Sequence, residues 1–109
     1  TRLYNFASKK TEQSIIKSLE DKDSMVRKAA ARVLGNLQVE KAVLPLIESL
    51  NDGAPGVREA AARALGKFRN KKAIDPLIGR LNDSSHSVKR AALGSLGNFC
   101  VNSSAVAQG

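Results

Sequence analysis

We expect an all-α fold, an α-solenoid of antiparallel helix pairs that repeat every 31 residues. The segment 26–37, VRKAAARVLGNL, returns at 57–68 and at 88–99, displaced by 31 residues each time. A self-similar period of this length is typical of solenoid repeats. Apolar residues recur within each copy at spacings of three and four, which indicates helices rather than strands. Aromatic residues make up only 4% of the chain, so its core must come from aliphatic contacts between neighbouring repeats.

The register of the repeat sets the expected boundaries of one continuous solenoid domain. A shift by 31 residues places Leu3 on Leu34 and Lys10 on Lys41, so the first residues match the end of a unit. The last residues match the beginning of a unit before the pattern decays. We therefore expect a fragment of a longer array. The expected segments are the end of a preceding repeat at 1–10, complete repeats at 11–41, 42–72 and 73–103, and the start of a further repeat or a tail at 104–109.

Each complete unit is expected to begin with a short amphipathic helix, at about residues 12–19 in the first unit. Pro45 and Pro76 fall in the first turn of the later copies, where proline is tolerated because the N–H groups lack intrahelical partners. The apolar residues at helical spacing are Ile15, Ile16 and Leu19, then Leu46, Ile47 and Leu50, then Leu77, Ile78 and Leu81.

A polar turn leads into the second helix of each unit. Asp23 is a candidate N-cap for the first of these helices, and Pro55 suits the first helical position of the middle copy. One apolar stripe on each second helix is expected to face the core. The stripe consists of Val26, Ala30, Leu34 and Leu37, then Val57, Ala61, Leu65 and Phe68, then Val88, Ala92, Leu96 and Phe99.

Gly35, Gly66 and Gly97 occupy one register inside this helical pattern. Glycine within a helix costs about 1 kcal/mol relative to alanine. Its return at one position therefore predicts close packing against a neighbouring helix.

Composition limits the functional classes. The formal net charge is +8, which favours an acidic partner. The one cysteine, Cys100, excludes an internal disulfide and fits a reducing compartment, so we expect a cytoplasmic location. No apolar run approaches the length of a membrane span.

The pattern D-x5-R-x-A-A-A-x2-L-G that begins at Asp21, with the segments AVLPLIESL and AIDPLIGRL, resembles the short HEAT-like repeat of the phycobilisome-lyase type. The resemblance covers about residues 12–99. That family includes bilin lyase subunits, a metal-dependent hydroxylase, DNA glycosylases and many scaffolds. The hydroxylase would need several His–Glu pairs, but His86 is the one histidine. The glycosylase would need an aromatic pocket, which four aromatic residues do not supply.

Charged residues six positions apart recur across the turn of each unit. They are read as a structural ladder of ion pairs between successive repeats, as similar positions are in HEAT arrays. A charged binding row is the alternative. The ladder residues are Asp21 and Arg27, Asp52 and Arg58, and Asp83 and Lys89.

Basic residues also dominate the face of the second helices that lies off the core stripe. The resemblance implies that this face is concave, so stacking aligns the charges into a strip for an acidic protein partner. Ordinary solvated surface is the alternative. Nucleic acid is a weaker candidate, because no aromatic residue interleaves with the cations for base stacking. The predicted binding residues are Lys28, Arg32, Arg63, Lys67 and Arg90.

The sequence therefore predicts a non-enzymatic protein–protein interaction scaffold. We expect no catalytic residue, metal site or cofactor, since His86 lacks companions for a closed metal site. A bilin lyase or lyase-chaperone subunit and a nucleic-acid-binding module remain alternatives. Exposed apolar residues at the two ends also predict end-to-end self-association.

Overall fold

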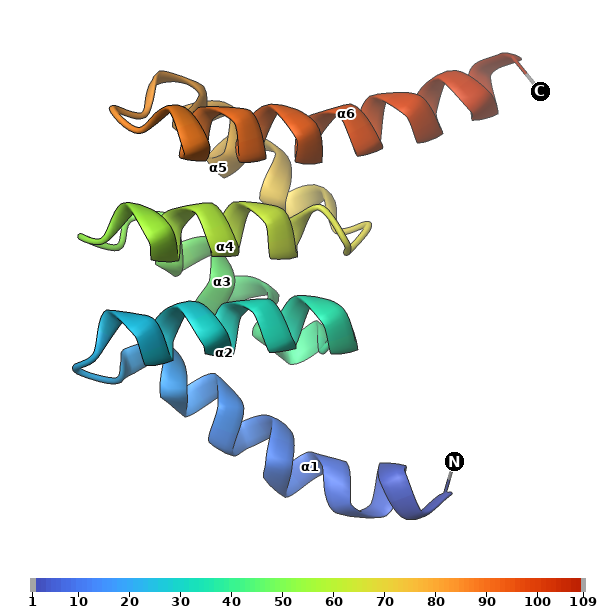
Figure 1. Cartoon of the computed structure of the whole chain (residues 1–109). Coiled ribbons are helices and arrows are strands. Elements are labelled where there is room, and N and C mark those ends of the chain that lie inside the picture. Colours follow the sequence, from blue (N-terminus) through green and yellow to red (C-terminus); the bar gives the residue numbers. More distant parts are fainter. Residues whose placement is uncertain (1, 109) are drawn as a thin grey trace.

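Three pairs of helices stack in chain order, each pair beside the next (Figure 1). The computed structural model describes the backbone of residues 2–108 and the side chains of residues 9–99. Within that range the regular structure is entirely helical, which confirms the predicted all-α solenoid. In chain order the elements are α1 (Arg2–Lys17), a 3-10 turn (Ser18–Glu20), α2 (Ser24–Leu37), a 3-10 turn (Glu40–Ala42), α3 (Val43–Ser49), α4 (Pro55–Leu65), a 3-10 turn (Lys71–Ala73), α5 (Ile74–Gly79), a 3-10 turn (Arg80–Asn82) and α6 (His86–Gln108).

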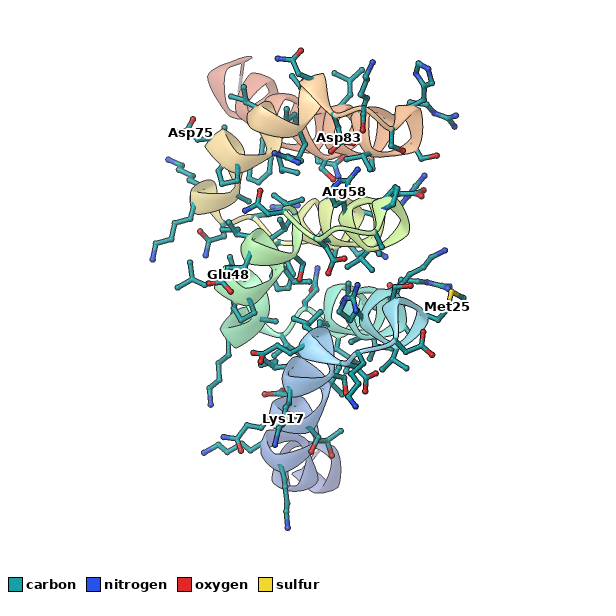
Figure 2. The ribbon with its side chains drawn as sticks, turned by 90° about the vertical axis from the view of Figure 1, so that its left-hand side faces the viewer. Lys17, Met25, Glu48, Arg58, Asp75 and Asp83 are labelled. Atoms are coloured by element: carbon teal, nitrogen blue, oxygen red, sulfur yellow. The ribbon has the colours of Figure 1, made fainter. Side chains whose placement is uncertain are left out.

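The helices form two layers. The first helix of each pair (α1, α3 or α5) is called helix A, and the second (α2, α4 or α6) is called helix B. The helices B stack directly on one another, α2 on α4 and α4 on α6, whereas α3 and α5 lie behind them and α1 lies at the lower end of the stack, below α2 (Figures 1 and 2). The principal extents are 40 × 36 × 16 Å, so the stack is a flat slab. None of the described helices has the length and apolar character needed to cross a membrane.

Local sequence explains where the helices B begin and end. Asp23 caps α2, because its Oδ1 accepts a hydrogen bond of 2.9 Å from the backbone N–H of Met25. Pro55 begins α4, where its fixed φ suits the first turn. Gln38 ends α2 in the left-handed region with a φ of 54°, and its N–H donates to the carbonyl of Gly35. The N-cap and the proline position confirm two sequence predictions.

The core stripe is buried in the second unit, buried at Val88 and Ala92 but only partly buried at Leu96 and Phe99 in the third, and exposed at both ends in the first. Val57, Phe68 and Val88 are at most 4% exposed, but Val26 is 37% exposed and Leu37 is 41% exposed. The prediction that Val26 and Leu37 lie in the core is therefore wrong. Their flank of α2 is the one that α4 and α6 use to pack on the preceding helix B. Among the described residues no helix B covers this flank of α2, and α1 diverges from it toward the N-terminus (Figure 1).

The two end segments continue neighbouring helices. Residues 2–10 run without a break into the rest of α1, and residues 104–108 continue α6 beyond the length of the other helices B. The repeat boundaries at 1–10 and 104–109 thus remain predictions, and residues 1 and 109 lie outside the described range.

The recurring glycines allow helices B to approach closely. A Cβ added to Gly35 would lie 2.7 Å from Cα of Ala64, and one added to Gly66 would lie 2.8 Å from Cβ of Ser95. Both distances are too short for real atoms, so the glycine leaves room that the next helix B fills. At Gly97 nothing lies within 4 Å of the added Cβ. Gly66 lies just past the end of α4 rather than inside it.

We predict that Gly35→Ala lowers the free energy of unfolding by about 1–3 kcal/mol, since the new methyl group overpacks the contact with Ala64. The matched control Gly97→Ala should raise stability by up to about 1 kcal/mol, because helix propensity improves and nothing obstructs the methyl group. Urea unfolding followed by circular dichroism measures both changes. Equal effects at the two positions would show that Gly35 is not a site of close approach.

Candidate functional site

A groove lies on the helix-B side of the slab, where α2, α4 and α6 run side by side. Its volume is about 410 Å³. Small side chains of α4 and α6 form its floor, and longer polar side chains of all three helices form its walls. We call it the basic groove, and its lining residues are Arg32, Asn36, Ala60, Arg63, Ala64, Lys67, Arg90, Ala91, Gly94, Ser95 and Asn98.

The structure places all five predicted binding residues at this groove or directly beside it. Arg32, Arg63, Lys67 and Arg90 line the groove itself. Lys28 lines a smaller hollow of about 250 Å³ that shares Arg32 and Arg63 with the groove. All of these side chains are exposed except that of Lys28, which is half-buried.

The cations differ in how far their charges are already engaged. Arg63 pairs with Glu59 one helical turn earlier, at 3.1 Å, and the Nζ of Lys67 donates to Oδ1 of Asn36 at 2.7 Å. Among the described residues, Arg32 and Arg90 have no hydrogen bond or ion pair to the protein. These two guanidinium groups, one on α2 and one on α6, therefore remain free to bind an anion.

The described residues that line the groove include no histidine, cysteine, aspartate or glutamate. Within residues whose side chains are described, no three His, Cys, Asp or Glu groups come together as metal ligands. His86 is exposed at the start of α6. The side chain of Cys100 lies outside the described residues.

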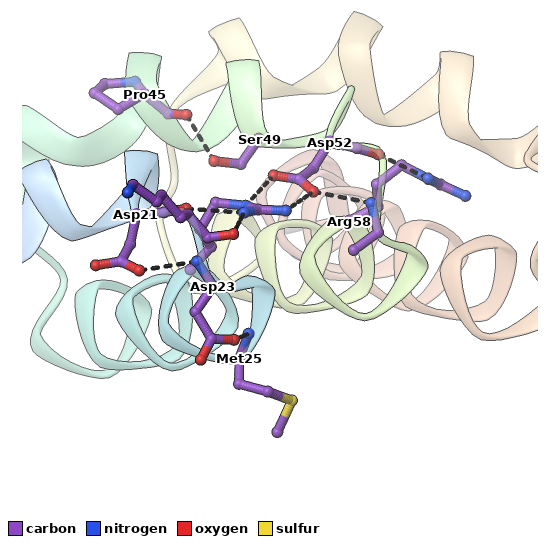
Figure 3. Close-up of polar contacts among 10 residues, drawn as sticks. Asp21, Asp23, Met25, Pro45, Ser49, Asp52 and Arg58 are labelled. Carbon is purple, nitrogen blue, oxygen red and sulfur yellow. Dashed lines mark hydrogen bonds and ion pairs between the residues drawn. The ribbon is translucent and has the colours of Figure 1, made fainter.

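The ion-pair ladder is the second charged feature, and it lies between the units. Nε of Arg27 donates to Oδ2 of Asp52 at 2.8 Å, and Nη2 of Arg27 donates to Oδ1 at 3.0 Å (Figure 3). Arg58 repeats this bidentate geometry with Asp83, at 2.9 and 3.1 Å. Each arginine thus binds the aspartate of the following unit, 25 residues later in the chain.

Within its own unit each arginine binds backbone carbonyls. Nη1 of Arg27 donates to the carbonyl oxygens of Asp21 and Lys22, at 2.8 and 3.0 Å. Nη1 of Arg58 donates to the carbonyl of Asp52 at 2.7 Å. The spacing of six residues therefore reflects a bond to the main chain of the turn, not to the carboxylate at that position.

The outermost members of the predicted ladder lack such partners. Asp21 uses its carboxylate to accept the backbone N–H of Asp23 at 2.9 Å. Within the described residues, Lys89 forms no ion pair. The structure thus contains two complete rungs, Arg27–Asp52 and Arg58–Asp83.

The ladder lowers the pKa of both carboxyl groups. For Asp83 the hydrogen bond from Arg58 lowers the pKa most, and the N–H of Ser85 and the charges of Arg58 and Arg80 add to it against the opposing effect of burial. For Asp52 burial raises the pKa, but Arg27, the N–H of Ala54 and the charge of Arg58 together outweigh it. The same contact raises the pKa of Arg27.

We predict that Asp83→Asn lowers the free energy of unfolding by about 3 kcal/mol at pH 7, because Arg58 is left without its counter-charge beside a site only 2% exposed. Asparagine can still accept the N–H of Ser85 through its Oδ1, but its amide NH2 replaces the Oδ2 that accepts from Arg58 and Arg80, so the change removes the charge together with one acceptor. Because the pKa of Asp83 is lowered on folding, its contribution is complete above the unfolded value of about 3.9 and disappears as the pH falls through the folded value.

The difference between wild type and Asp83→Asn should therefore shrink when urea unfolding is repeated at about pH 3 and below. Glu48→Gln is the control, since Glu48 is exposed on α3 and forms no ion pair among the described residues (Figure 2). A pH-independent difference would contradict an ionic role for Asp83.

Comparison with protein families agrees with this architecture. A model of HEAT repeats matches residues 2–57 and residues 43–108. The two matches overlap in the second unit and together include every helix from α1 to α6. No curated protein matches the chain. Its stacked helix pairs and the length of these matches together show that the chain belongs to the HEAT-repeat family.

Proposed function

We propose that this HEAT-repeat chain is a non-enzymatic interaction scaffold that binds an acidic protein partner in the basic groove. The observation that carries the proposal is the convergence of Lys28, Arg32, Arg63, Lys67 and Arg90 from three successive helices B on adjoining hollows. Solenoid repeats generally present such extended surfaces to partners.

The charged residues that line the basic groove and the smaller hollow beside it favour an anionic ligand. Glu59 is the one acidic residue that lines these two hollows. One exposed charge is worth little in water, but packed helices lie about 8–10 Å apart, which is comparable to the screening length of roughly 8 Å, so cations on adjacent helices B reinforce one another's field. Such a field raises association rates and rejects basic competitors. The groove therefore selects for acidic partners before any close contact forms.

The floor of the groove favours a protein over a nucleic acid. Ala60, Ala64, Ala91, Gly94 and Ser95 have short side chains, so a polypeptide backbone can lie close to the helices. No aromatic residue lines the basic groove, whereas single-stranded nucleic acids are usually held by stacking on aromatic side chains.

We predict that Arg32→Glu combined with Arg63→Glu weakens binding of an acidic partner at least tenfold and leaves the helical content unchanged, because both residues are exposed. The matched control is Lys10→Glu with Lys17→Glu, which makes the same change in net charge on exposed positions of α1; Figure 2 labels Lys17. Pull-downs from the source cell at low and high salt, with circular dichroism of each variant, measure the effect.

Retention of the same partners by wild type and by the Arg32→Glu, Arg63→Glu variant would show that the groove is only solvated surface. The same experiment tests the other functions that remain open. A pigment that copurifies and absorbs visible light would favour a bilin lyase or lyase-chaperone subunit. Binding to DNA or RNA that falls steeply with salt would favour a nucleic-acid module. A cytoplasmic location is also part of the proposal, and rests on the single cysteine.

We also propose that the isolated chain associates end to end. The outer flank of α2 exposes Val26, Val33 and Leu37, and the outer flank of α6 exposes Leu93, which is 62% exposed. In the internal repeat the equivalent positions are buried, Ala64 on the flank of α4 that meets α2 and Ala62 on the flank that meets α6, so the two outer flanks offer similar packing surfaces. Sedimentation should show mass increasing with concentration, and Leu93→Glu should reduce this association. A strict monomer at high concentration would contradict it.

A further inference from the structure

A second group of cations lies where the chain leaves α4. The segment 67–72, KFRNKK, contains Lys67, Arg69, Lys71 and Lys72 and no acidic residue. All four side chains are exposed. Among the described residues none of them forms an ion pair. Arg69, Lys71 and Lys72 are called the connection cluster, because they lie between α4 and α5 (Figure 1).

Shared lining residues join the connection cluster to the basic groove. A hollow of about 310 Å³ shares Lys67 and Asn98 with the groove, and it is lined by Gln38, Gly66, Lys67, Phe68, Arg69, Asn98 and Phe99. A further shallow hollow of about 530 Å³ is lined by Glu40, Arg69, Asn70, Lys71 and Lys72, and it shares Arg69 with the previous one. The hollows therefore adjoin one another from the groove to the connection cluster.

This path follows the axis of α4 instead of crossing from repeat to repeat. Glu59 and Arg63 lie one turn apart on α4, and Lys67 and Arg69 follow just beyond its end. The 11 residues of α4 rise about 17 Å, which an extended polypeptide covers with about five residues. Reaching Lys71 and Lys72 requires several more, so the whole path needs about ten.

We infer that the ligand of the basic groove is an extended acidic segment of about ten residues, which lies along α4 and leaves the groove over the connection cluster. This inference rests on the proposed function and specifies the form of the partner. An extended chain can enter each hollow in turn, whereas a folded surface touches mainly their rims. Arg32 and Arg90 bind its first half, and Arg69, Lys71 and Lys72 bind its second half.

Two linked contact regions make affinity depend on ligand length. Once the first half of the segment is bound, the second half meets the connection cluster at high effective concentration. A peptide that spans both regions should therefore bind far more tightly than one that fills the groove alone. A solvated cluster with no binding role would add only a weak, screened attraction.

The test uses fluorescein-labelled peptides of alternating glutamate and serine, one of about five residues and one of about ten. Fluorescence anisotropy at about 0.15 M salt measures their dissociation constants. Lys71→Glu with Lys72→Glu should weaken the long peptide about tenfold or more, while the equally charged control Lys10→Glu with Lys17→Glu should weaken it about twofold or less. The short peptide should respond equally to both variants. Backbone amide resonances of residues 69–72 should shift with the long peptide only.

Equal weakening of the long peptide by both variants would overturn the inference. The proposed function would still stand in that case if Arg32→Glu with Arg63→Glu abolished binding. Loss of binding in Lys71→Glu, Lys72→Glu but not in Arg32→Glu, Arg63→Glu would overturn the groove itself. Tighter binding of a ten-nucleotide oligothymidine than of the long peptide would overturn an acidic protein segment as the ligand.

Discussion

The bidentate bond between an arginine and the aspartate of the next unit is the contact on which the stack depends. Arg27 and Arg58 each bind two groups at once. One is a backbone carbonyl in the turn of their own unit, and the other is the aspartate carboxylate of the following unit. A planar guanidinium is suited to this because its donors form a rigid fork. The same aspartates hold the backbone N–H groups of Ala54 and Ser85, so each rung also orders the turn before the next helix B. The same aspartate contacts therefore set the spacing between two repeats and fix where the helix B of the second repeat begins.

The close approach of the helices B is the second contact that holds the stack together, and it determines where the basic groove lies. Gly35 faces Ala64 and Gly66 faces Ser95, and the hydroxyl of Ser95 donates to the carbonyl of Ala62 at 2.6 Å. Because small residues hold the helices this near, the long side chains on either side must extend outward and line a groove. The structure therefore separates two kinds of cation. Arg27 and Arg58 form ion pairs between the units, whereas Arg32 and Arg90 in the groove form none within the part of the chain whose side chains are described.

Much of this could be predicted from the sequence because it depends on periodicity. The 31-residue register predicted the helix pairs, and it grouped the groove cations on one face of the helices B. The partner of each ladder arginine could not be assigned from the spacing of six residues, since the contact that matters joins residues 25 apart. Burial of Val26 and Leu37 was predicted wrongly, because a repeat pattern specifies which face would pack but not whether a neighbour is present. The connection cluster escaped notice because Arg69, Lys71 and Lys72 do not recur together in the other units.

The restriction of the connection cluster to one unit bears on function. A feature shared by all repeats, such as the ladder, is explained by stacking, which every unit must satisfy. A feature confined to one connection has no such explanation. The equivalent of Lys71 in the unit before is Glu40, so the basic character of 69–72 is local, and its charges are not needed for folding in any contact among the described residues. Mutual repulsion among these cations also costs some stability. An anion that lies across them would relieve the repulsion. The inferred ligand would reach them along α4, after it has bound Arg32 and Arg90 in the groove.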